Sequence, residues 1–223
     1  MKLAEEIRKD RETFANLENR KAKLAFLWDY YKLPIVGIVL AMIIVVASLV
    51  NLIFRKPVAL YAVLVNSDAQ IIEVDDDVFN RELEKAGIKM GKSVVDINDY
   101  LTLGMDNREE DDIETLQVLN ALFSITDLDV FVGFKDDFDM FIEGDAFLDL
   151  SEHIDEGILS KRKDDLYSYK NSEGKMIVGG IVLHPGSPLH EAYYYHNDVL
   201  IGVASNAANL DNALALIEQL LRD

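Results

Sequence analysis

The sequence contains no cysteine, a single tryptophan and four prolines. Without cysteine, the chain offers neither a thiol nucleophile nor a cysteine for lipid attachment. This absence is compatible with a location outside the cytoplasm without disulfides, and it does not decide the compartment. The sequence also has no G-x-S-x-G motif, no H-E-x-x-H motif and no Gly-rich phosphate loop. We therefore expect a protein that is not an enzyme and that uses no cofactor.

Basic residues are scarce, and their distribution is uneven. The chain carries 22 Lys and Arg against 40 Asp and Glu, a formal net charge of -18. Residues 57–223 hold 12 of the basic and 34 of the acidic residues, whereas residues 1–56 hold 10 and 6. A domain as acidic as 57–223 is repelled by phosphate backbones and by anionic membrane surfaces. Nucleic acid is therefore not an expected partner.

One long segment has no charge at all. Residues 33–54, LPIVGIVLAMIIVVASLVNLIF, form an uncharged run of 22 residues. As a helix the run would be about 33 Å long, which is enough to cross a hydrocarbon core of roughly 30 Å. It is longer than the apolar region of a signal peptide, 32 residues precede it, and no small-x-small cleavage site follows it. These features favour a membrane anchor over a cleaved signal peptide.

The flanks of the apolar run predict its orientation and its contacts. Basic residues nearby are Arg20, Lys21, Lys23 and Lys32 before the run, and Arg55 and Lys56 after it. This imbalance predicts a cytoplasmic N-terminus and an extracellular C-terminal domain in a single-pass protein of the cell membrane. Aromatic side chains that suit the membrane interface are Trp28, Tyr30 and Tyr31. Gly37-x-x-x-Ala41 is a small-xxx-small pair that would allow close contact with another membrane helix.

Hydrophobic periodicity predicts alternating strands and helices after the anchor. Strands are expected at 58–66, 93–103, 129–134, 176–183 and 199–204, and helices at 74–86, 111–125, 136–143 and 209–221. Between them, residues 155–175 are predicted to form a polar excursion and residues 184–196 a loop. This order predicts an α/β fold, a mostly parallel sheet with helices on both faces, preceded by one transmembrane helix. The expected parts are a cytoplasmic segment 1–32, a transmembrane helix 33–54 and an extracytoplasmic domain 57–223.

Two of these segments allow more detailed expectations. Within helix 111–125, the residues predicted to share one side are Ile113, Leu116, Leu119, Leu122 and Phe123. In strand 176–183, Gly179 and Gly180 are expected to mark close packing of neighbouring backbone or side chains.

Two segments resemble extracellular solute-binding proteins of the periplasmic-binding-protein type II fold. The first is DVFVG at 129–133 followed by DAFLDL at 145–150. It is similar to the family's strand, short helix and "G-x-L-x-D-L" phrase. The second is DVLIGVASN at 198–206 with the helix 209–221, which is similar to the family's closing strand, Ser-Asn turn and C-terminal helix. The segment WDYYK at 28–32, which leads into the apolar run, resembles anchored extracytoplasmic proteins of Gram-positive bacteria.

The chain departs from this family in two respects. Members have two lobes and are far longer, and a lipidated cysteine usually tethers them, whereas this chain has a membrane helix. With these departures, the resemblance implies a truncated or one-lobed module that contacts a membrane partner.

Candidate binding residues gather in the segment HPGSPLHEAYYYH. His184, His190 and His196 recur at intervals of six, a spacing that does not make ligands converge on a metal as an i, i+4 helix pair does. The residues that would line a ligand cleft are Tyr193, Tyr194, Tyr195, His184 and His196, with Asp136 at the end of the strand 129–134. The same tyrosines would equally serve as core or interface residues. Acid clusters such as DDD at 75–77 lack the EF-hand calcium pattern and suit solvated helix N-termini.

Two functions follow from these observations. The first is a non-enzymatic accessory or binding subunit of a membrane complex, either ABC-transporter-like or sensory, with a membrane protein as partner. The second is a receptor that binds a small molecule in a cleft of the α/β domain, and a hydrolase is a weaker third possibility. A receptor should have a pocket lined by 193–195, whereas an accessory subunit should have an exposed apolar patch or a conspicuous helix face in the membrane.

Overall fold

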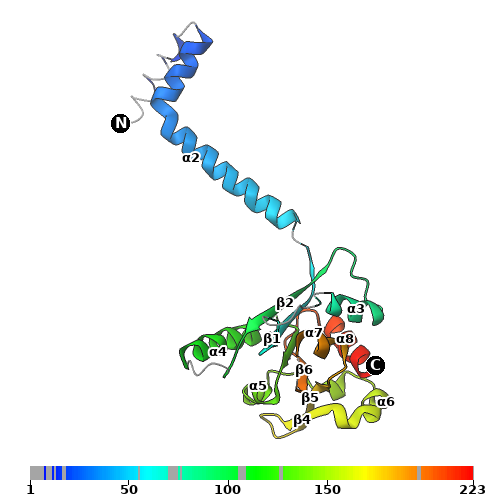
Figure 1. Cartoon of the computed structure of the whole chain (residues 1–223). Helices are drawn as coiled ribbons and strands as arrows, with labels where there is room; N and C mark the ends of the chain where they lie inside the picture. The colour runs from blue at the N-terminus through cyan, green and yellow to red at the C-terminus, as the bar shows by residue number, and fades with distance from the viewer. Residues whose placement is uncertain are drawn as a thin grey trace. The chain divides into compact units, whose positions relative to one another are not determined.

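The computed structural model describes residues 8, 12, 14–16, 19–54, 56–69, 75, 77–104, 109–125, 128–194 and 197–222. The chain divides into two compact units, Met1–Arg55 and Lys56–Asp223. We describe each unit by itself (Figure 1).

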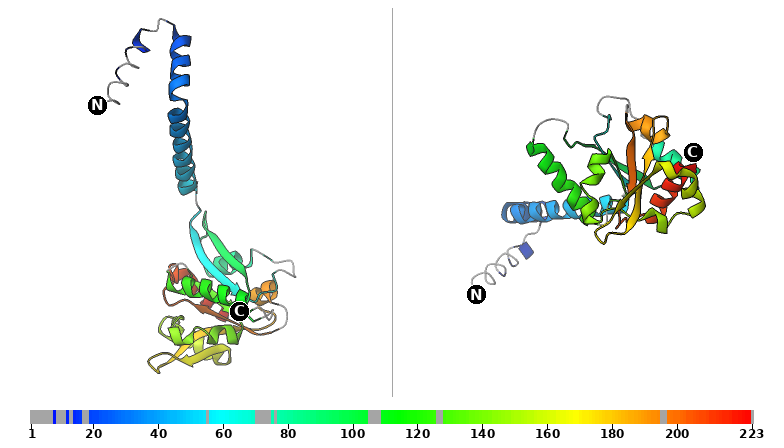
Figure 2. Two further views of the ribbon diagram at one scale, coloured as in Figure 1. Left: turned by 90° about the vertical axis from the view of Figure 1, so that its left-hand side faces the viewer. Right: turned by 90° about the horizontal axis from the view of Figure 1, so that it is seen from below.

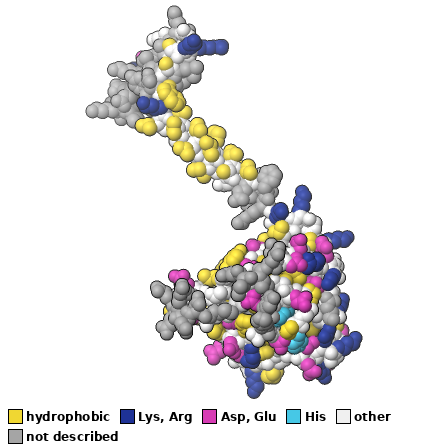
Figure 3. Space-filling model, viewed as in Figure 1, with side chains coloured by type: hydrophobic (Ala, Val, Ile, Leu, Met, Phe, Trp, Pro, Cys, Tyr) yellow, Lys and Arg dark blue, Asp and Glu magenta, His cyan; other side chains and the backbone are white. Residues whose placement is uncertain are grey.

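The first unit is dominated by one helix, α2 (Arg20–Phe54), which runs through Pro34. Its segment Lys32–Val50 has a mean hydropathy of 3.0, and none of that segment is buried within the protein. Hydrophobic side chains cover this part of the helix (Figure 3). The length and composition of α2 are compatible with a membrane anchor or a signal sequence. The predicted apolar span 33–54 lies within α2, which begins upstream of it.

The second unit is built on six strands. They are β1 (Val58–Val65), β2 (Val94–Leu101), β3 (Val130–Gly133), β4 (Leu166–Lys170), β5 (Met176–Leu183) and β6 (Val199–Val203). The helices are α3 (Val78–Lys85), α4 (Glu109–Ser124), α5 (Lys135–Asp139), α6 (Glu156–Leu159), α7 (Pro188–Tyr193) and α8 (Leu210–Arg222). Three 3₁₀ helices, η1 (Ile142–Gly144), η2 (Leu150–Glu152) and η3 (Ser160–Asp165), complete the connections.

The strands form a single mixed sheet in the order β2-β1-β3-β6-β5-β4 (Figure 1). The pairs β1–β2 and β1–β3 are parallel, whereas β3–β6, β5–β6 and β4–β5 are antiparallel. The α/β class is confirmed, but the predicted mostly parallel sheet is not. The reason is local in one case, because β4 and β5 are joined by a tight turn in which the Gly174 N–H donates to the Asn171 carbonyl. A connection this short can join only antiparallel strands.

Three connections differ from the sequence prediction. The expected polar excursion 155–175 contains α6, η3 and the edge strand β4. The expected loop 184–196 contains helix α7, which begins with Pro188 at its first turn, where proline is well tolerated. The single helix expected at 136–143 is divided into α5 and η1, which are separated by Met140 and Phe141, and Asp145 ends η1 in a left-handed conformation (φ 50°).

The sheet separates two hydrophobic clusters, as the alternation along β3 illustrates. Val130 and Val132 point into a cluster shared with α3, α7 and α8, which includes Phe79 and Leu216. Phe131 points to the opposite face, into a cluster shared with α4 and α5. Successive side chains of a strand face opposite ways, so both faces of β3 are buried. Figures 1 and 2 show helices on both faces of the sheet.

Phenylalanines on the α4–α5 face explain why β3 is followed by the short helix α5 and then by the apolar segment 146–150. The rings of Phe138 in α5 and Phe147 are stacked, with centroids 4.3 Å apart and an angle of 13° between their planes. Phe131 of β3 meets Phe138 edge to face at 5.2 Å. The Leu148 N–H then donates to the Val203 carbonyl at 2.9 Å, so the segment returns to β6. β3, α5 and the segment that contains Phe147 therefore pack their rings together in one aromatic layer.

Glycines allow the middle strands to approach this aromatic layer. A Cβ at Gly202 would lie 2.6 Å from the Gly179 carbonyl oxygen and 2.9 Å from the Phe138 ring. A Cβ at Gly180 would lie 2.8 Å from the Ile201 carbonyl oxygen, and one at Gly179 would collide with the Tyr169 ring. The predicted close packing at Gly179 and Gly180 is confirmed.

Gly202→Ala should therefore destabilise the domain by about 1–3 kcal/mol, the usual cost of overpacking a tight core. Gly144→Ala is the control, because no heavy atom lies within 4 Å of its Cβ position, and its effect should stay within about 0.5 kcal/mol. Urea unfolding of the full chain in detergent measures the stability of both variants. Near-UV circular dichroism of the tyrosines and phenylalanines follows the domain, because the single tryptophan, Trp28, lies outside it. Equal midpoints for the two variants would contradict the close approach.

Asp129 joins four elements at the start of β3. Its carboxylate is fully buried and accepts hydrogen bonds from the Tyr61 N–H of β1 at 2.8 Å, and from the Asn209 N–H at 2.7 Å and side-chain amide at 2.9 Å. Its own N–H donates to the Tyr61 carbonyl, and its carbonyl accepts from the Ala204 N–H that follows β6. Asn209 immediately precedes α8, so this single residue ties β1, β3, β6 and α8 together.

Asp129→Ala should lower the free energy of unfolding by about 3 kcal/mol or more. Hydrogen bonds to a charged group contribute about 1.5–3 kcal/mol each, and the buried donors would be left without an acceptor. Chemical denaturation of the full chain measures the loss. Glu173→Ala, at an exposed turn, is the control and should change stability by less than about 0.5 kcal/mol. A loss below 1 kcal/mol for Asp129→Ala would contradict the assigned role.

Candidate functional site

A groove opens at the carboxyl end of β5. It has a volume of about 250 Å³ and is lined by Arg162, Asp165, Leu220 and residues 182–188. Since β5 is antiparallel to β6, and β6 to β3, the end of β5 lies at the same edge of the sheet as the carboxyl ends of β1 and β3. This edge is where open α/β sheets usually bind ligands.

His184 is held between two carboxylates at this groove. Its Nδ1 lies 2.8 Å from Asp198 Oδ1, and its Nε2 lies 3.1 Å from Asp165 Oδ1. The hydrogen bond with Asp198 and the contact with Asp165 raise the pKa of His184, and its partial burial opposes them. Only the charged imidazolium donates from both nitrogens. In its charged form, His184 therefore links the end of β5 to the start of β6 and to η3.

The remaining charges of the groove are paired within it. Arg162 Nε donates to the Leu221 carbonyl at 3.1 Å, and its Nη1 donates to Asp165 Oδ2 at 3.4 Å. Ser187 Oγ is buried without a hydrogen-bond partner among the residues the structure describes. The groove is smaller than the roughly 300–1,000 Å³ of typical ligand pockets. The Ser187 hydroxyl is the group that the groove offers to a small polar molecule. Binding to the charged side chains instead would require the molecule to break their ion pairs.

The carboxyl ends of β1 and β3 are filled by the chain's own polar side chains. Asn66 follows β1 with a left-handed backbone (φ 56°), and its amide donates to Asp137 Oδ1 at 3.1 Å. Asn66 Oδ1 accepts from the Leu103 N–H at 2.7 Å. Tyr194 Oη donates to the Val65 carbonyl at 2.9 Å. A ligand at this topological switch point would have to displace these buried contacts.

Burial governs the ionisation of two of these groups. It raises the pKa of Asp137, although hydrogen bonds from the Phe134 N–H and from Asn66 oppose the shift. Burial also raises the pKa of Tyr194 well above its ordinary value. Both changes follow from desolvation of the charged form. Tyr194 is therefore a neutral hydrogen-bond donor at physiological pH.

The structure places the predicted ligand residues in different surroundings. Tyr193 and Tyr194 are 1% and 2% exposed, and they pack in the core rather than on a cleft wall. Tyr193, the last residue of α7, lies 5.9 Å from the Phe79 ring. Asp136 is exposed on α5, whereas its neighbour Asp137 is buried. Of the six residues, only His184 lines the groove, and Tyr195 and His196 lie outside the described residues.

The histidines do not share a partner in the described part of the chain. His190 is buried, and its Nε2 lies 2.7 Å from the Asn197 carbonyl, whereas His184 contacts Asp165 and Asp198. Sequence reasoning missed both carboxylates that hold His184. Asp198 could have been noticed, because it directly precedes a buried strand at the edge that carries His184.

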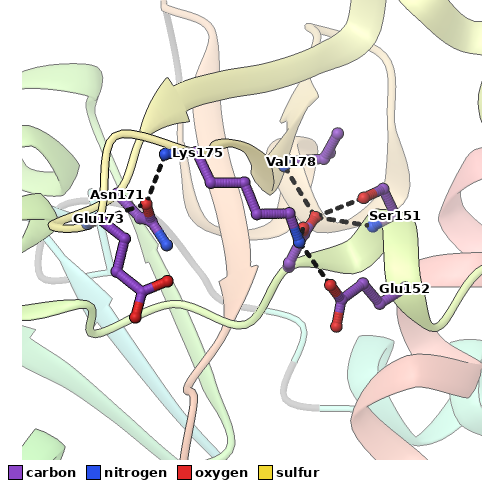
Figure 4. Close-up of polar contacts among 7 residues, drawn as sticks. Ser151, Glu152, Asn171, Glu173, Lys175 and Val178 are labelled. Carbon is purple, nitrogen blue, oxygen red and sulfur yellow. Dashed lines mark hydrogen bonds and ion pairs between the residues drawn. The ribbon is translucent and has the colours of Figure 1, made fainter.

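Asp149, the acid of the "D-L" phrase, has a structural role. It precedes η2 and accepts hydrogen bonds from the Ser151 N–H at 3.1 Å, from the Val178 N–H at 3.1 Å and from Lys175 Nζ at 3.1 Å (Figure 4). Lys175 also contacts Glu152. Burial disfavours the charge on Asp149, but these hydrogen bonds outweigh it and lower the pKa of its carboxyl group. The cluster fastens η2 to β5 as a cap and cross-link.

Helix α4 exposes apolar side chains. Ile113 is 55% exposed, Val118 44% and Ile125, just beyond the helix, 50%. Ile113 was expected on the core side with Leu119, and that expectation is wrong, because only Leu116, Leu119, Leu122 and Phe123 pack against the sheet. Views at right angles place α4 at the periphery of the domain (Figures 1 and 2).

The predicted membrane residues lie on α2. Trp28 is 59% exposed, and Tyr30 and Tyr31 belong to the helix although their side chains lie outside the described part. Gly37 and Ala41 are exposed one turn apart, and no atom lies within 4 Å of a Cβ built on Gly37. A partner helix would find this surface open within the described residues of the first unit.

Comparison with protein-family models, with curated proteins and with solved structures finds no match to this chain.

The pH dependence of stability tests the contact of His184 with Asp165 and Asp198. The raised pKa of folded His184 means that its contribution to stability is complete below the unfolded pKa of roughly 6.5 and is lost as the pH rises through the folded pKa. Because half of the ring is exposed, the contribution should stay below about 1 kcal/mol. Proton NMR of the His184 ring should show a titration above that of a model histidine. The substitution Asp198→Asn should lower the pKa of His184. The control Asp164→Asn, at an exposed position next to Asp165, should leave that pKa nearly unchanged. An unshifted pKa insensitive to Asp198→Asn would contradict the geometry.

Proposed function

We propose that the chain is a non-enzymatic, membrane-anchored accessory subunit whose extracytoplasmic α/β domain binds a membrane protein partner. The observation that supports this most directly is the exposed apolar face of α4, with Ile113, Val118 and Ile125. Val118 and Ile125 lie two turns apart on one side of the helix, and exposed apolar side chains gathered on one side of a domain commonly mark a protein interaction site.

The anchor and its orientation support the same proposal. The span Lys32–Val50 contains a single charged residue at its start and is not buried by the rest of the chain. More basic residues precede this apolar segment than follow it, which favours a cytoplasmic N-terminus. Gly37 and Ala41 would allow close contact with a helix of the partner inside the membrane. The complex would be ABC-transporter-like or sensory, as the resemblance to solute-binding proteins implies.

A second candidate function is a small-molecule receptor. The groove beside His184, with the buried Ser187 hydroxyl, supports it. The burial of Tyr193 and Tyr194 and the polar contacts that fill the ends of β1 and β3 weigh against it. Of the two distinguishing features, the apolar patch is thus better supported than the tyrosine-lined pocket.

Purification of the full chain from its native membranes in mild detergent tests the proposal. We expect a heterologous membrane protein in stoichiometric amount, and Val118→Asp should reduce its recovery at least severalfold because a charge would be buried in the apolar contact. Met176→Asp is the control, since Met176 on β5 is also an exposed apolar residue, at 56% against 44% for Val118. Light scattering of the purified sample measures the mass. A monomer without partner, or equal losses in both variants, would contradict the proposal.

A further inference from the structure

The outer face of α4 is defined here as Ile113, Gln117, Val118, Ala121 and Ile125, all of which are exposed. Val118, Ala121 and Ile125 follow the i, i+3, i+7 spacing of one helical stripe. The Ile125 N–H donates to the Ala121 carbonyl at 3.0 Å, so the helical geometry continues to Ile125. Ala121 lies between larger apolar side chains on this stripe, and such a small residue lets another helix approach closely.

The inner face of α4 is apolar as well. Leu119 is fully buried, and Leu116, Leu122 and Phe123 pack against the same cluster. The exposed side of α4 also carries the polar residues Glu114, Asn120 and Ser124, so its apolar residues stand beside polar ones, as in interfaces with a polar rim. Here the domain covers one side of α4 and leaves the other in solvent. The outer face is therefore a surface that a binding partner should cover.

The charge around this surface restricts the partner. Residues 96–125, which contain most of β2, the following connection and α4, carry eight Asp and Glu and one basic residue, Arg108. A second copy of the chain would bring the same acids, and an anionic lipid surface would bring further negative charge. Both are disfavoured electrostatically. An occupant with basic side chains beside its apolar surface is complementary.

The charges on α4 are distributed unevenly along the helix. All five acids of the helix lie between Glu109 and Glu114, in its first two turns, and none lies in the second half. The Gly104 N–H donates to Asp112 Oδ1 at 2.8 Å, so the residue that lies just beyond β2 is tied to the first turn of α4. The basic residues of the occupant should therefore face the first two turns of α4, and its apolar residues should face Val118 to Ile125.

We propose that the outer face of α4 docks an amphipathic helix of the partner protein, apolar on one face and edged with Lys or Arg. This proposal rests on the proposed function and specifies the chemistry of the partner. A helix suits this face, since the small side chain of Ala121 would let the ridges of a second helix approach closely. The acids and the apolar stripe together set which way along α4 the docked helix lies.

Site-specific photocrosslinking in native membranes tests the proposal. A photoreactive phenylalanine analogue replaces Val118 in the full chain, and a second sample carries it at Met176 as the control. We expect the Val118 sample to form an adduct with another protein. Mass spectrometry of the crosslinked peptide should find apolar residues at helical spacing together with Lys or Arg within one turn.

Charge variants measured in the same crosslinking assay separate the electrostatic part. Glu114→Lys should lower the adduct yield about threefold, the scale expected for reversing an exposed ion pair, and Glu114→Gln should lower it less. Glu173→Lys, on an exposed turn between β4 and β5, is the charge-matched control and should leave the yield unchanged. Raising the salt concentration should narrow the difference between Glu114→Lys and the unaltered chain.

The outcomes distinguish this proposal from the function on which it rests. A heterologous adduct through a segment without basic residues, or a yield insensitive to Glu114→Lys, would overturn the partner chemistry and leave the accessory function standing. An adduct with a second copy of the chain or with lipid, or a yield equal to that at Met176, would overturn both.

Discussion

The buried carboxylate of Asp129 is the contact on which the domain most depends. Burial of a carboxylate costs several kcal/mol unless hydrogen bonds replace its hydration. Here the donors come from β1 and from Asn209, at the entry to α8. The charge also lies at the N-terminal end of α8, where the helix dipole stabilises an anion. Burial of Asp129 therefore requires that the first strand and the last helix of the domain are both in place, which couples the two ends of residues 58–222 in folding.

Strong periodic patterns made much of this fold predictable. The apolar runs of β1, β3, β5 and β6 are long enough, and sufficiently free of charge, to be recognised as buried strands. Strand direction was harder to predict, because it depends on the connections. Strand β4 has Tyr167 and Tyr169 among charged residues within 155–175, so its pattern was obscured, and with it the β4–β5 hairpin, one of the three antiparallel pairs of the mixed sheet. The Asn-Ser-Glu-Gly turn at 171–174 was the available signal.

The candidate site shows why local spacing could not predict its geometry. The two partners of His184 lie 14 and 19 residues away along the chain, and neither belongs to the series of histidines that recur at intervals of six. At the end of β3, the prediction selected Asp136, but the turn into α5 directs Asp137 inward, where the Phe134 N–H donates to it at 2.9 Å. A shift of one residue in a short helix turns a side chain by about 100°, and sequence alone does not determine that phase.

The contrast between α4 and α8 explains why the sequence did not predict the outer face of α4. Helix α8 has a buried side with Ala213, Leu216 and Ile217, and exposed Asp211 on another, so its apolar residues identify its inner face. Helix α4 has apolar residues on both sides, and Ile113 could not be assigned to a face from its type alone. An outer face of five residues is small beside the interfaces of stable soluble complexes, which bury roughly 1,200–2,000 Å². A membrane anchor changes that requirement, because two proteins held in one membrane meet at a high effective concentration, and a contact of modest area can then suffice. Under the proposed function, α2 as the anchor and the outer face of α4 as the docking surface would be two parts of one binding function.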